Sequence, residues 1–308
     1  MSNRIKNKIL VLEKDFFDLN NIPKNIYYDF YNKKTTNFKD YLILAVRLKY
    51  KIDDKFLKKF KNLKFIITFT TGLDHIDQIY CKKNNIIIFS LRNIKKVLNQ
   101  VSSAAEHAWM LTLLTIRKFH RVQFDKRDLP VGLQLMNKKI GIIGLGRIGK
   151  KIMKYSKAFG MDTYYHDIKK LNIINDYKYK NLDQIFIKCN IILVSVTADE
   201  KNRNLINKDL INLMNSNSIL INISRDWIVD EIELLKKIKK KEIYGYGADF
   251  INKKNLKAIF STSNIIEINR KHNIILTDHA GGNNVDAIKY VEKKLFYQFF
   301  LKYFKNKN

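Results

Sequence analysis

The stretch KIGIIGLGRIGKKIMKYSKAFG, residues 139–160, decides the fold of this chain. An apolar run of strand character leads into a turn with three glycines, and an amphipathic segment of helical period follows it. Gly144 suits a tight turn, Gly146 lets the backbone approach a pyrophosphate, and Gly149 lets the helix pack closely against the strand. The free N–H groups at the start of the helix would bind the phosphates. The stretch therefore predicts a dinucleotide-binding strand–turn–helix unit.

A second strand-like run, DTYYHD (162–167), ends in the carboxylate of Asp167. Asp167 lies 18 residues beyond Gly149 (167 − 149), close to the spacing of about 20 at which an acid binds the adenosine ribose hydroxyls. A carboxylate there repels a 2′-phosphate, so the spacing predicts NAD(H) rather than NADP(H). The alternative is a glycine-rich strand–helix turn that holds no ligand.

Short apolar runs rich in Ile, Val and Tyr alternate with helix-length segments along the whole chain. The runs are 8–13, 41–46, 64–69, 85–89, 139–144, 162–167, 190–196, 218–224, 242–250 and 273–277. This alternation is typical of parallel strands covered by helices on both faces, and so predicts a doubly wound α/β fold. A length of 308 residues favours two domains.

Composition narrows the class of protein. The formal net charge is +29, but the excess is mostly Lys spread over the whole length, and no nucleic-acid-binding motif accompanies it. Solvated basic faces are therefore favoured over a nucleic-acid surface, although the charge should attract small anions. Two cysteines, Cys81 and Cys189, give neither a disulfide framework nor metal-ligand spacing, and buried thiols are expected. Without a long uncharged apolar run or a secretory signal, we expect a cytoplasmic protein with no membrane partner.

The start of one helix can be predicted from the sequence. Ser103 and Glu106 have the spacing of a capping box, and the apolar segment HAWMLTLLTIR follows. A buried helix is predicted to begin at Ser103, with Ser103 as its cap, and to lead from one domain into the other. Residues 119–139 read as a loop-rich connector.

Three polar residues follow strand-like runs in the second half of the chain, where an open parallel sheet binds its ligand. They are Arg225, Asp249 and His279. A guanidinium binds a carboxylate in bidentate fashion and can polarise a neighbouring carbonyl. An imidazole can exchange the proton that accompanies hydride transfer. Together with a dinucleotide, these residues indicate oxidation of an alcohol beside a carboxylate, or the reverse reduction.

In these motifs the chain resembles the D-isomer-specific 2-hydroxyacid dehydrogenase family. The matching segments are 70–77 (TTGLDHID), 99–117, 141–149, 219–231, 245–250 and 273–282 (NIILTDHAGG), in the family's order. The resemblance implies a Rossmann-type NAD-binding domain, residues 99–282, inserted into a smaller flavodoxin-like substrate domain, residues 1–98 and 283–308. It also implies a homodimer built through the NAD-binding domains.

The resemblance also implies roles for individual residues. Arg225 matches the arginine that binds the substrate carboxylate, His279 the acid/base, and Asp249 the acid that contacts the nicotinamide carboxamide, and all three border the cofactor. The other implied contacts are Gly144, Gly146, Arg147, Ile148, Gly149, Asp167, Thr197, Ile223, Ser224 and Gly282 for NAD, and Thr71 and Gly72 for the substrate.

One departure from the family pattern concerns the chemistry. The glutamate that usually pairs with the histidine is replaced by Lys254, and a cation near the imidazole would lower the histidine pKa. We hypothesise that Asp226, Asp278 or Glu267 supplies the missing carboxylate.

The sequence thus predicts an NAD-dependent oxidoreductase that acts on a small 2-hydroxy or 2-oxo acid, with no metal and no nucleic acid. The alternative is an NAD(H)-binding sensor or scaffold protein of the same fold whose turnover is lost or weak. A nucleic-acid binder is a third hypothesis, and it rests on charge alone.

Overall fold

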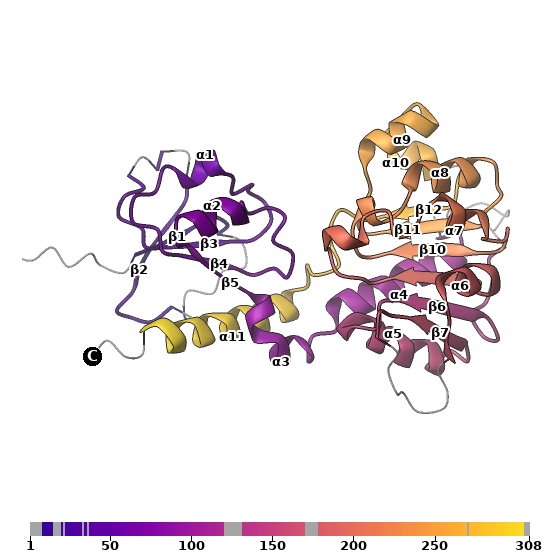
Figure 1. Ribbon diagram of the computed structural model, residues 1–308, viewed down its shortest axis with the longest axis horizontal. Coiled ribbons are helices and arrows are strands. Elements are labelled where there is room, and N and C mark those ends of the chain that lie inside the picture. Colours follow the sequence, from indigo (N-terminus) through magenta and orange to yellow (C-terminus); the bar gives the residue numbers. More distant parts are fainter. Residues whose placement is uncertain are drawn as a thin grey trace, which may run out of the picture. The chain divides into compact units, whose positions relative to one another are not determined.

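The structure is a computed structural model that describes residues 8–14, 20, 22–32, 34–35, 37–119, 131–169, 178–269 and 271–304. It contains two compact units, coloured along the sequence in Figure 1. One unit consists of Met1–Val101 and Asn284–Asn308, and the other is Ser102–Asn283, inserted between those two segments. Residues 120–130 of the predicted connector lie outside the described residues.

The first unit is built on a five-stranded parallel sheet with strand order β2-β1-β3-β4-β5. Its strands are β1 (Lys8–Val11), β2 (Tyr27–Phe30), β3 (Ile43–Val46), β4 (Phe65–Thr68) and β5 (Ile87–Ser90). This is the flavodoxin-like order, as the family resemblance implied. β2 was not predicted, because its residues YYDF are partly exposed and lack the continuous apolar character of the buried strands.

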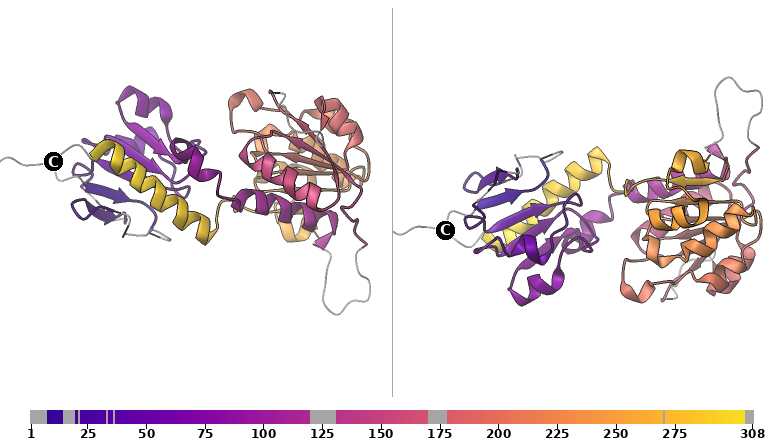
Figure 2. Two further views of the ribbon diagram at one scale, coloured as in Figure 1. Left: turned by 90° about the horizontal axis from the view of Figure 1, so that it is seen from below. Right: turned by 90° about the horizontal axis from the view of Figure 1, so that it is seen from above.

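The C-terminal helix α11 (Val285–Phe304) completes this unit although it is distant in sequence from the strands. Figure 2 shows it lying along the sheet. Phe296 and Phe299 of the helix are fully buried and meet Phe69, Phe65 and Phe89 of the strand region. The other helices of the unit are α1 (Asp54–Leu57), α2 (Gln78–Lys83), the 3-10 helix η2 (Leu91–Ile94) and α3 (Lys95–Leu98).

A buried ion pair reinforces the attachment of α11. Arg47 follows β3, and its Nη2 lies 2.9 Å from Oε2 of Glu292 on α11, whose side chain is 1% exposed. The backbone N–H of Arg47 donates to Glu13. Arg47 therefore has a structural role in this unit.

The inserted unit has a seven-stranded sheet with order β12-β11-β10-β9-β6-β7-β8, and every pair in it is parallel. Its strands are β6 (Lys139–Ile143), β7 (Asp162–His166), β8 (Lys178–Tyr179), β9 (Ile191–Val194), β10 (Ile219–Asn222), β11 (Gly245–Ala248) and β12 (Ile274–Leu276). Counted from β6, this is the Rossmann order with one added strand, and the chain reverses direction across the sheet between β6 and β9. The doubly wound prediction is confirmed.

Helices cover both faces of this sheet (Figure 1). They are α4 (Ser103–Ile116), α5 (Arg147–Ala158), α6 (Leu182–Lys188), α7 (Lys208–Asn212), α8 (Glu231–Lys239), α9 (Lys253–Phe260) and α10 (Ile265–Asn269), with the 3-10 helices η4 (Glu200–Asn202) and η5 (Asp226–Ile228). α4 packs directly on β11, because a Cβ at Gly247 would lie 2.8 Å from Thr115 Oγ1 of that helix.

The predicted capping box at Ser103 is wrong. The N-cap of α4 is Ser102, which makes no side-chain cap hydrogen bond. The hydroxyl of Ser103 donates instead to the carbonyl of Gly281 at 2.9 Å. A tertiary hydrogen bond has replaced the local one, and it ties the start of α4 to the segment that contains His279.

Both cysteines are buried free thiols, as expected. In the part of the chain that the structure describes, no helix has the length and apolarity needed to cross a bilayer.

Candidate active site at the strand ends

The turn between β6 and α5 needs its three glycines for different reasons. Gly144 has a φ of +91°, a conformation that L side chains rarely adopt. A Cβ at Gly149 would lie 2.2 Å from the carbonyl oxygen of Gly144, so any side chain there would force helix and strand apart. A Cβ at Gly146 would meet nothing within 4 Å. The backbone at Gly146 is therefore open to a ligand.

The start of α5 is suited to an anion. Gly146 is the N-cap and supplies no side chain to the first N–H groups, which an anion can then bind. Arg147 and Ile148 follow in the first turn and are half-buried. Burial lowers the pKa of Arg147 from its usual value.

Asp167 at the end of β7 supports the glycine turn directly. Its Oδ2 accepts the N–H of Leu145 at 2.7 Å, and its Oδ1 accepts the N–H of Lys169 at 3.0 Å. Ser195, which the sequence analysis did not single out, donates its hydroxyl to the carbonyl of Gly144 at 2.8 Å. The turn is thus held from both neighbouring strands, and the carboxylate lies beside it.

The predicted contacts along the next strands differ in exposure. Thr197, beyond β9, is exposed, Ile223 is half-buried, and Ser224 is buried and donates its hydroxyl to the carbonyl of Val196 at 2.9 Å. The fully buried amide of Asn222 closes the turn after β10, because Nδ2 donates to the carbonyl of Arg225 and Oδ1 accepts the N–H of Ser224. Arg225 is thereby fixed at the carboxyl end of β10.

Asp249, at the end of β11, organises the segment that contains His279. Its side chain is buried, and Oδ1 accepts the N–H of Ala280 and the hydroxyl of Thr277, each at 2.7 Å. Oδ2 accepts the N–H of Gly281 at 3.0 Å. The N–H of His279 donates to the carbonyl of Asp249 at 2.9 Å. Four hydrogen bonds to Asp249 therefore hold the segment from Thr277 to Gly281, which contains His279.

His107 of α4 completes this network and was not predicted. Its Nε2 lies 2.9 Å from Thr277 Oγ1 and 3.3 Å from Asp249 Oδ1. Because the threonine hydroxyl donates to Asp249, Nε2 is the donor in the contact with Thr277. Burial acts to raise the pKa of Asp249, but hydrogen bonds from His107, Thr277, Gly281 and Ala280 outweigh it and hold that pKa below its usual value. Asp249 is therefore a carboxylate near neutral pH.

Arg225 and His279 meet the same aromatic ring. The guanidinium carbon of Arg225 lies 4.3 Å from the centroid of the Phe250 ring. The imidazole of His279 lies on that ring too, with centroids 4.1 Å apart and planes at 57°. His279 has a φ of +55°, which is unusual for a residue with a side chain. The structure thus brings together the arginine, aspartate and histidine that the sequence placed at separate strand ends.

The two glycines after the histidine are not equivalent. Gly281 is buried, and a Cβ there would lie 2.9 Å from Asp249 Oδ2. Gly282, the predicted contact, is exposed, and a Cβ there would meet nothing within 4 Å. Close packing against Asp249 therefore requires glycine at position 281.

Lys254 and the three carboxylates hypothesised to pair with His279 lie at different places in the inserted unit. Lys254 is exposed on α9, and Glu267 is exposed on α10, where it accepts a hydrogen bond from Asn264 at 3.2 Å. Asp278 is exposed beside the histidine, and Asp226 is half-buried at the start of η5, directly after Arg225. Asp226 and Asp278 are thus sequence neighbours of the cluster, whereas Glu267 belongs to a separate helix.

A buried carboxyl that the sequence analysis missed supports the start of α9. Glu231 is 2% exposed and accepts hydrogen bonds from the N–H of Asn252, the amide of Asn255 and the hydroxyl of Tyr246. Burial raises the pKa of Glu231 to about 7. No sequence signal separates it from the many surface glutamates at helix starts.

Thr71 and Gly72 belong to the other unit, where they follow β4. The carbonyl of Thr71 accepts a hydrogen bond from Arg92 Nε, and the carbonyl of Gly72 accepts the hydroxyl of Thr70 at 2.7 Å. The loop is ordered by contacts within its own unit.

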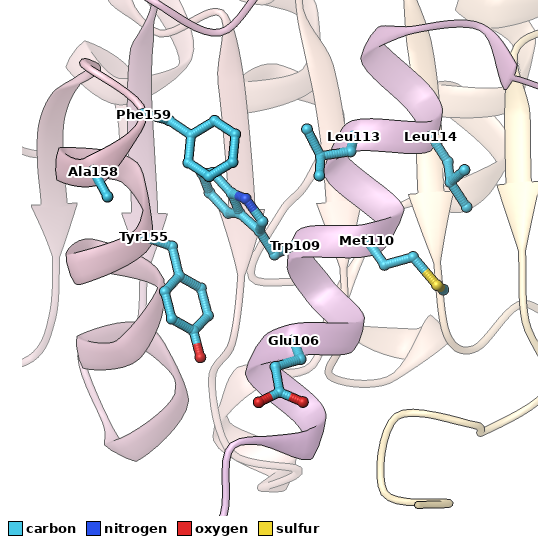
Figure 3. Close-up of a pocket in the computed structure, with 8 residues that line it drawn as sticks. All are labelled: Glu106, Trp109, Met110, Leu113, Leu114, Tyr155, Ala158 and Phe159. Atoms are coloured by element: carbon cyan, nitrogen blue, oxygen red, sulfur yellow. The ribbon is translucent and has the colours of Figure 1, made fainter.

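A groove of about 560 Å³ lies between α4 and α5 (Figure 3). Its lining is mostly apolar, with Glu106 as its one charged residue: Glu106, Trp109, Met110, Leu113, Leu114, Tyr155, Ala158 and Phe159. Met110 and Phe159 are 40% and 42% exposed. None of the predicted cofactor or substrate residues lines this groove. Among the described residues, no group of three His, Cys, Asp or Glu side chains could hold a metal ion.

Comparison with known proteins gives consistent matches. The family model described as D-isomer specific 2-hydroxyacid dehydrogenase, NAD binding domain, matches residues 91–281. The chain is 30% identical to hydroxypyruvate reductase of Thermotoga maritima over 272 residues, which are 82% of this chain and 83% of that protein. It is 27% identical to glyoxylate reductase of Pyrococcus furiosus over 267 residues, 81% of this chain and 75% of that one.

Solved structures agree on the fold. D-lactate dehydrogenase from Aquifex aeolicus, complexed with NAD and lactic acid, has a TM-score of 0.76 at 23% identity and covers 95% of this chain and 94% of its own. The apo-structure of D-lactate dehydrogenase from Escherichia coli has a TM-score of 0.78 at 19% identity, with 96% of each chain covered.

Proposed function

Because this chain belongs to the D-isomer specific 2-hydroxyacid dehydrogenase family, we propose that Arg225, Asp249 and His279 form its active site. The chain is an NAD-dependent oxidoreductase of 2-hydroxy and 2-oxo acids, and the matches support this function rather than the sensor alternative. The observation that carries the proposal is the placement of Arg225 and His279 on one ring, beside a buried carboxylate that fixes the histidine segment.

The glycine turn fits the pyrophosphate of NAD. The open backbone at Gly146 and the first N–H groups of α5, with Arg147 and Ile148, would hold the phosphates. Asp167 would accept hydrogen bonds from the adenosine ribose hydroxyls while it supports the turn. The remaining proposed contacts are Gly144, Gly149, Thr197, Ile223, Ser224, Asp249 and Gly282. When bound, the nicotinamide supplies or accepts the hydride.

Arg225 and His279 would act on the substrate. The guanidinium would bind the substrate carboxylate and draw electron density from the neighbouring carbonyl oxygen. The His279 imidazole would give that oxygen a proton during reduction and accept it during oxidation. In the unit that contains Thr71 and Gly72, the loop after β4 would supply backbone groups to the same carboxylate, so that unit would be the substrate domain.

We propose that this chain uses no glutamate at the usual position to assist the histidine, since the resemblance assigns Lys254 to that position. The exposed ammonium of Lys254 is solvated, which weakens its effect on the imidazole. The charged carboxylate of Asp249 accepts hydrogen bonds from the two residues that follow His279. It would thereby hold the His279 segment in place, as a glutamate partner of the imidazole would. Asp226, Asp278 and Glu267 stay alternatives for a direct partner.

The α4–α5 groove is the surface we propose for a homodimer through the NAD-binding domains. An exposed apolar surface with a single carboxylate suits a second copy of a chain whose other surfaces are rich in Lys. Leu113→Asp should turn dimer into monomer in light scattering, and a wild-type chain that is monomeric at all concentrations would exclude this dimer. A cytoplasmic location stays a prediction.

Turnover tests the proposed function. Purified protein should oxidise NADH in the presence of hydroxypyruvate, glyoxylate or pyruvate, and NADPH should bind more weakly than NADH because of Asp167. NADH binding without turnover, unchanged in His279→Ala, would favour the sensor alternative. Tighter binding of NADPH than NADH would contradict the role of Asp167.

A further inference from the structure

Phe250 contacts both residues to which the proposed chemistry assigns charge. Its ring centroid is 4.3 Å from the Arg225 guanidinium carbon and 4.1 Å from the centroid of the His279 imidazole. The side chain is half-buried. Arg225 and His279 come from segments that are 54 residues apart (279 − 225), so the ring is a shared contact between otherwise separate parts of the chain.

The backbone explains why the ring lies there. The carbonyl of Asp249, which accepts the N–H of His279 at 2.9 Å, belongs to the peptide bond that leads into Phe250. That hydrogen bond holds the Cα atoms of Phe250 and His279 near one another, and the hydrogen bonds of the Asp249 carboxylate prevent residues 280 and 281 from moving away. The main chain therefore keeps the backbone of Phe250 and of His279 close together, within reach of the ring contact.

The ring is also chemically suited to a guanidinium. An aromatic face carries negative electrostatic potential and attracts a cation, with Arg the commonest partner. Arg225 Nη1 donates to the carbonyl of Ser224 at 2.8 Å, so the guanidinium is held both by this oxygen and by the ring. A long side chain that is already held in one rotamer before the substrate binds loses less conformational entropy when the substrate binds.

We propose that Phe250 is a positioning residue that sets the guanidinium of Arg225 and the imidazole of His279 at the separation the 2-oxo acid requires. This inference rests on the proposed roles of Arg225 and His279 and adds the element that aligns them. Phe250 exchanges no proton and carries no charge, and it acts through the two side chains that it contacts.

The test replaces the ring and keeps an apolar side chain. For Phe250→Leu we expect kcat to fall and the KM for the 2-oxo acid to rise, with kcat/KM about tenfold lower. The dissociation constant of NADH should change far less than kcat/KM, because the glycine turn is untouched. Phe250→Tyr keeps the ring and should restore the wild-type values.

A matched control exists in the same unit. Phe260 of α9 is also half-buried and also packs on a histidine, His272, with ring centroids 4.8 Å apart. Phe260→Leu removes the same number of atoms from a comparable pair that is not part of the site. It should leave both kcat and KM at their wild-type values.

A spectroscopic measurement tests the contact without turnover. In an NMR spectrum of the NADH complex, with the His279 signal assigned from its absence in His279→Gln, Phe250→Leu should move the imidazole Hε1 resonance because the ring current is lost. Phe260→Leu should not move it. An unmoved Hε1 signal in Phe250→Leu would overturn the inference whether or not the protein is active.

Failure of the inference differs from failure of the proposed site. If Arg225→Ala and His279→Gln abolish activity while Phe250→Leu keeps wild-type kcat and KM, the site stands and the role of Phe250 is wrong. If Arg225→Ala and His279→Gln keep wild-type activity, the proposed site is wrong, and the role of Phe250 is overturned with it.

Discussion

The carboxyl edge of the seven-stranded sheet carries two regions that are built in different ways. The turn around Gly144 and Gly149 is a local structure, formed by one strand, one helix and the adjoining carboxylate of Asp167. The cluster around His279 is assembled from α4, β10, β11 and the segment after β12. Substitutions in the first region should therefore act mainly on cofactor affinity, and those in the second mainly on turnover.

The largest expected effect separates the two regions most clearly. Arg225→Ala removes the guanidinium that would bind the substrate carboxylate, and kcat/KM for hydroxypyruvate should fall about a thousandfold, as for loss of one partner of a desolvated ion pair. NADH fluorescence titration should show a far smaller loss of affinity, because the glycine turn that would hold the pyrophosphate is untouched. Equal loss of NADH affinity would mean that the two regions are not independent.

Within the glycine turn, two substitutions of the same kind should behave differently. Gly149→Ala places a Cβ 2.2 Å from the Gly144 carbonyl oxygen, and the free energy of unfolding should fall by about 3 kcal/mol. In Gly146→Ala the new Cβ points into open space, so the stability of the variant should match the wild type while its NADH affinity falls. Thermal denaturation and NADH titration on both variants decide this, and a stable Gly149→Ala would refute the packing argument.

Asp249→Asn should weaken the second region without changing its shape. Both carboxylate oxygens accept N–H groups, so an amide would set its own NH₂ against one of these donors. Stability should fall by about 2 kcal/mol, and kcat should fall because the His279 segment is less ordered. If kcat stays at the wild-type value, the ordering of that segment does not limit the reaction.

The smallest expected effect lies in the buried Glu231, outside both regions. Its pKa is about 7 in the folded chain against 4.5 for an ordinary glutamate, so between these values the folded state holds a proton that the unfolded state has released. Stability should therefore decrease as pH rises from about 4.5 to 7, by about 2 kcal/mol from this residue. Urea titrations at several pH values should show a flatter profile for Glu231→Gln, and Glu233→Gln on the same helix should keep the wild-type slope.

The same difference between regions decides what the sequence could predict. The buried strands and the glycine turn were predicted because their signals lie within a few consecutive residues. β8 was missed because it is only two residues long, and the cap at Ser103 was misassigned because a hydrogen bond to Gly281, far along the chain, replaced the local one. A local sequence pattern does not contain the distant hydrogen-bond partner that competes with the cap.

In the second region the sequence could place Arg225, Asp249 and His279 at strand ends, but not their contacts. His107 had a detectable signal, since it shares the buried face of α4 with Leu111 and Thr115 at helical spacing and is polar. The ring of Phe250 and the hydrogen bonds of Asp249 depend on how separate segments meet in space. The catalytic roles and the Lys254 position stay predictions.

The most direct test of the central claim is the rate of NADH oxidation by hydroxypyruvate in the wild type and in His279→Gln, with chiral analysis of the product. The proposed site predicts D-glycerate from the wild type, a kcat about a thousandfold lower in the variant, and only a small change in NADH affinity. NADH oxidation at the wild-type rate in His279→Gln, or NADH binding with no turnover by the wild type, would contradict it.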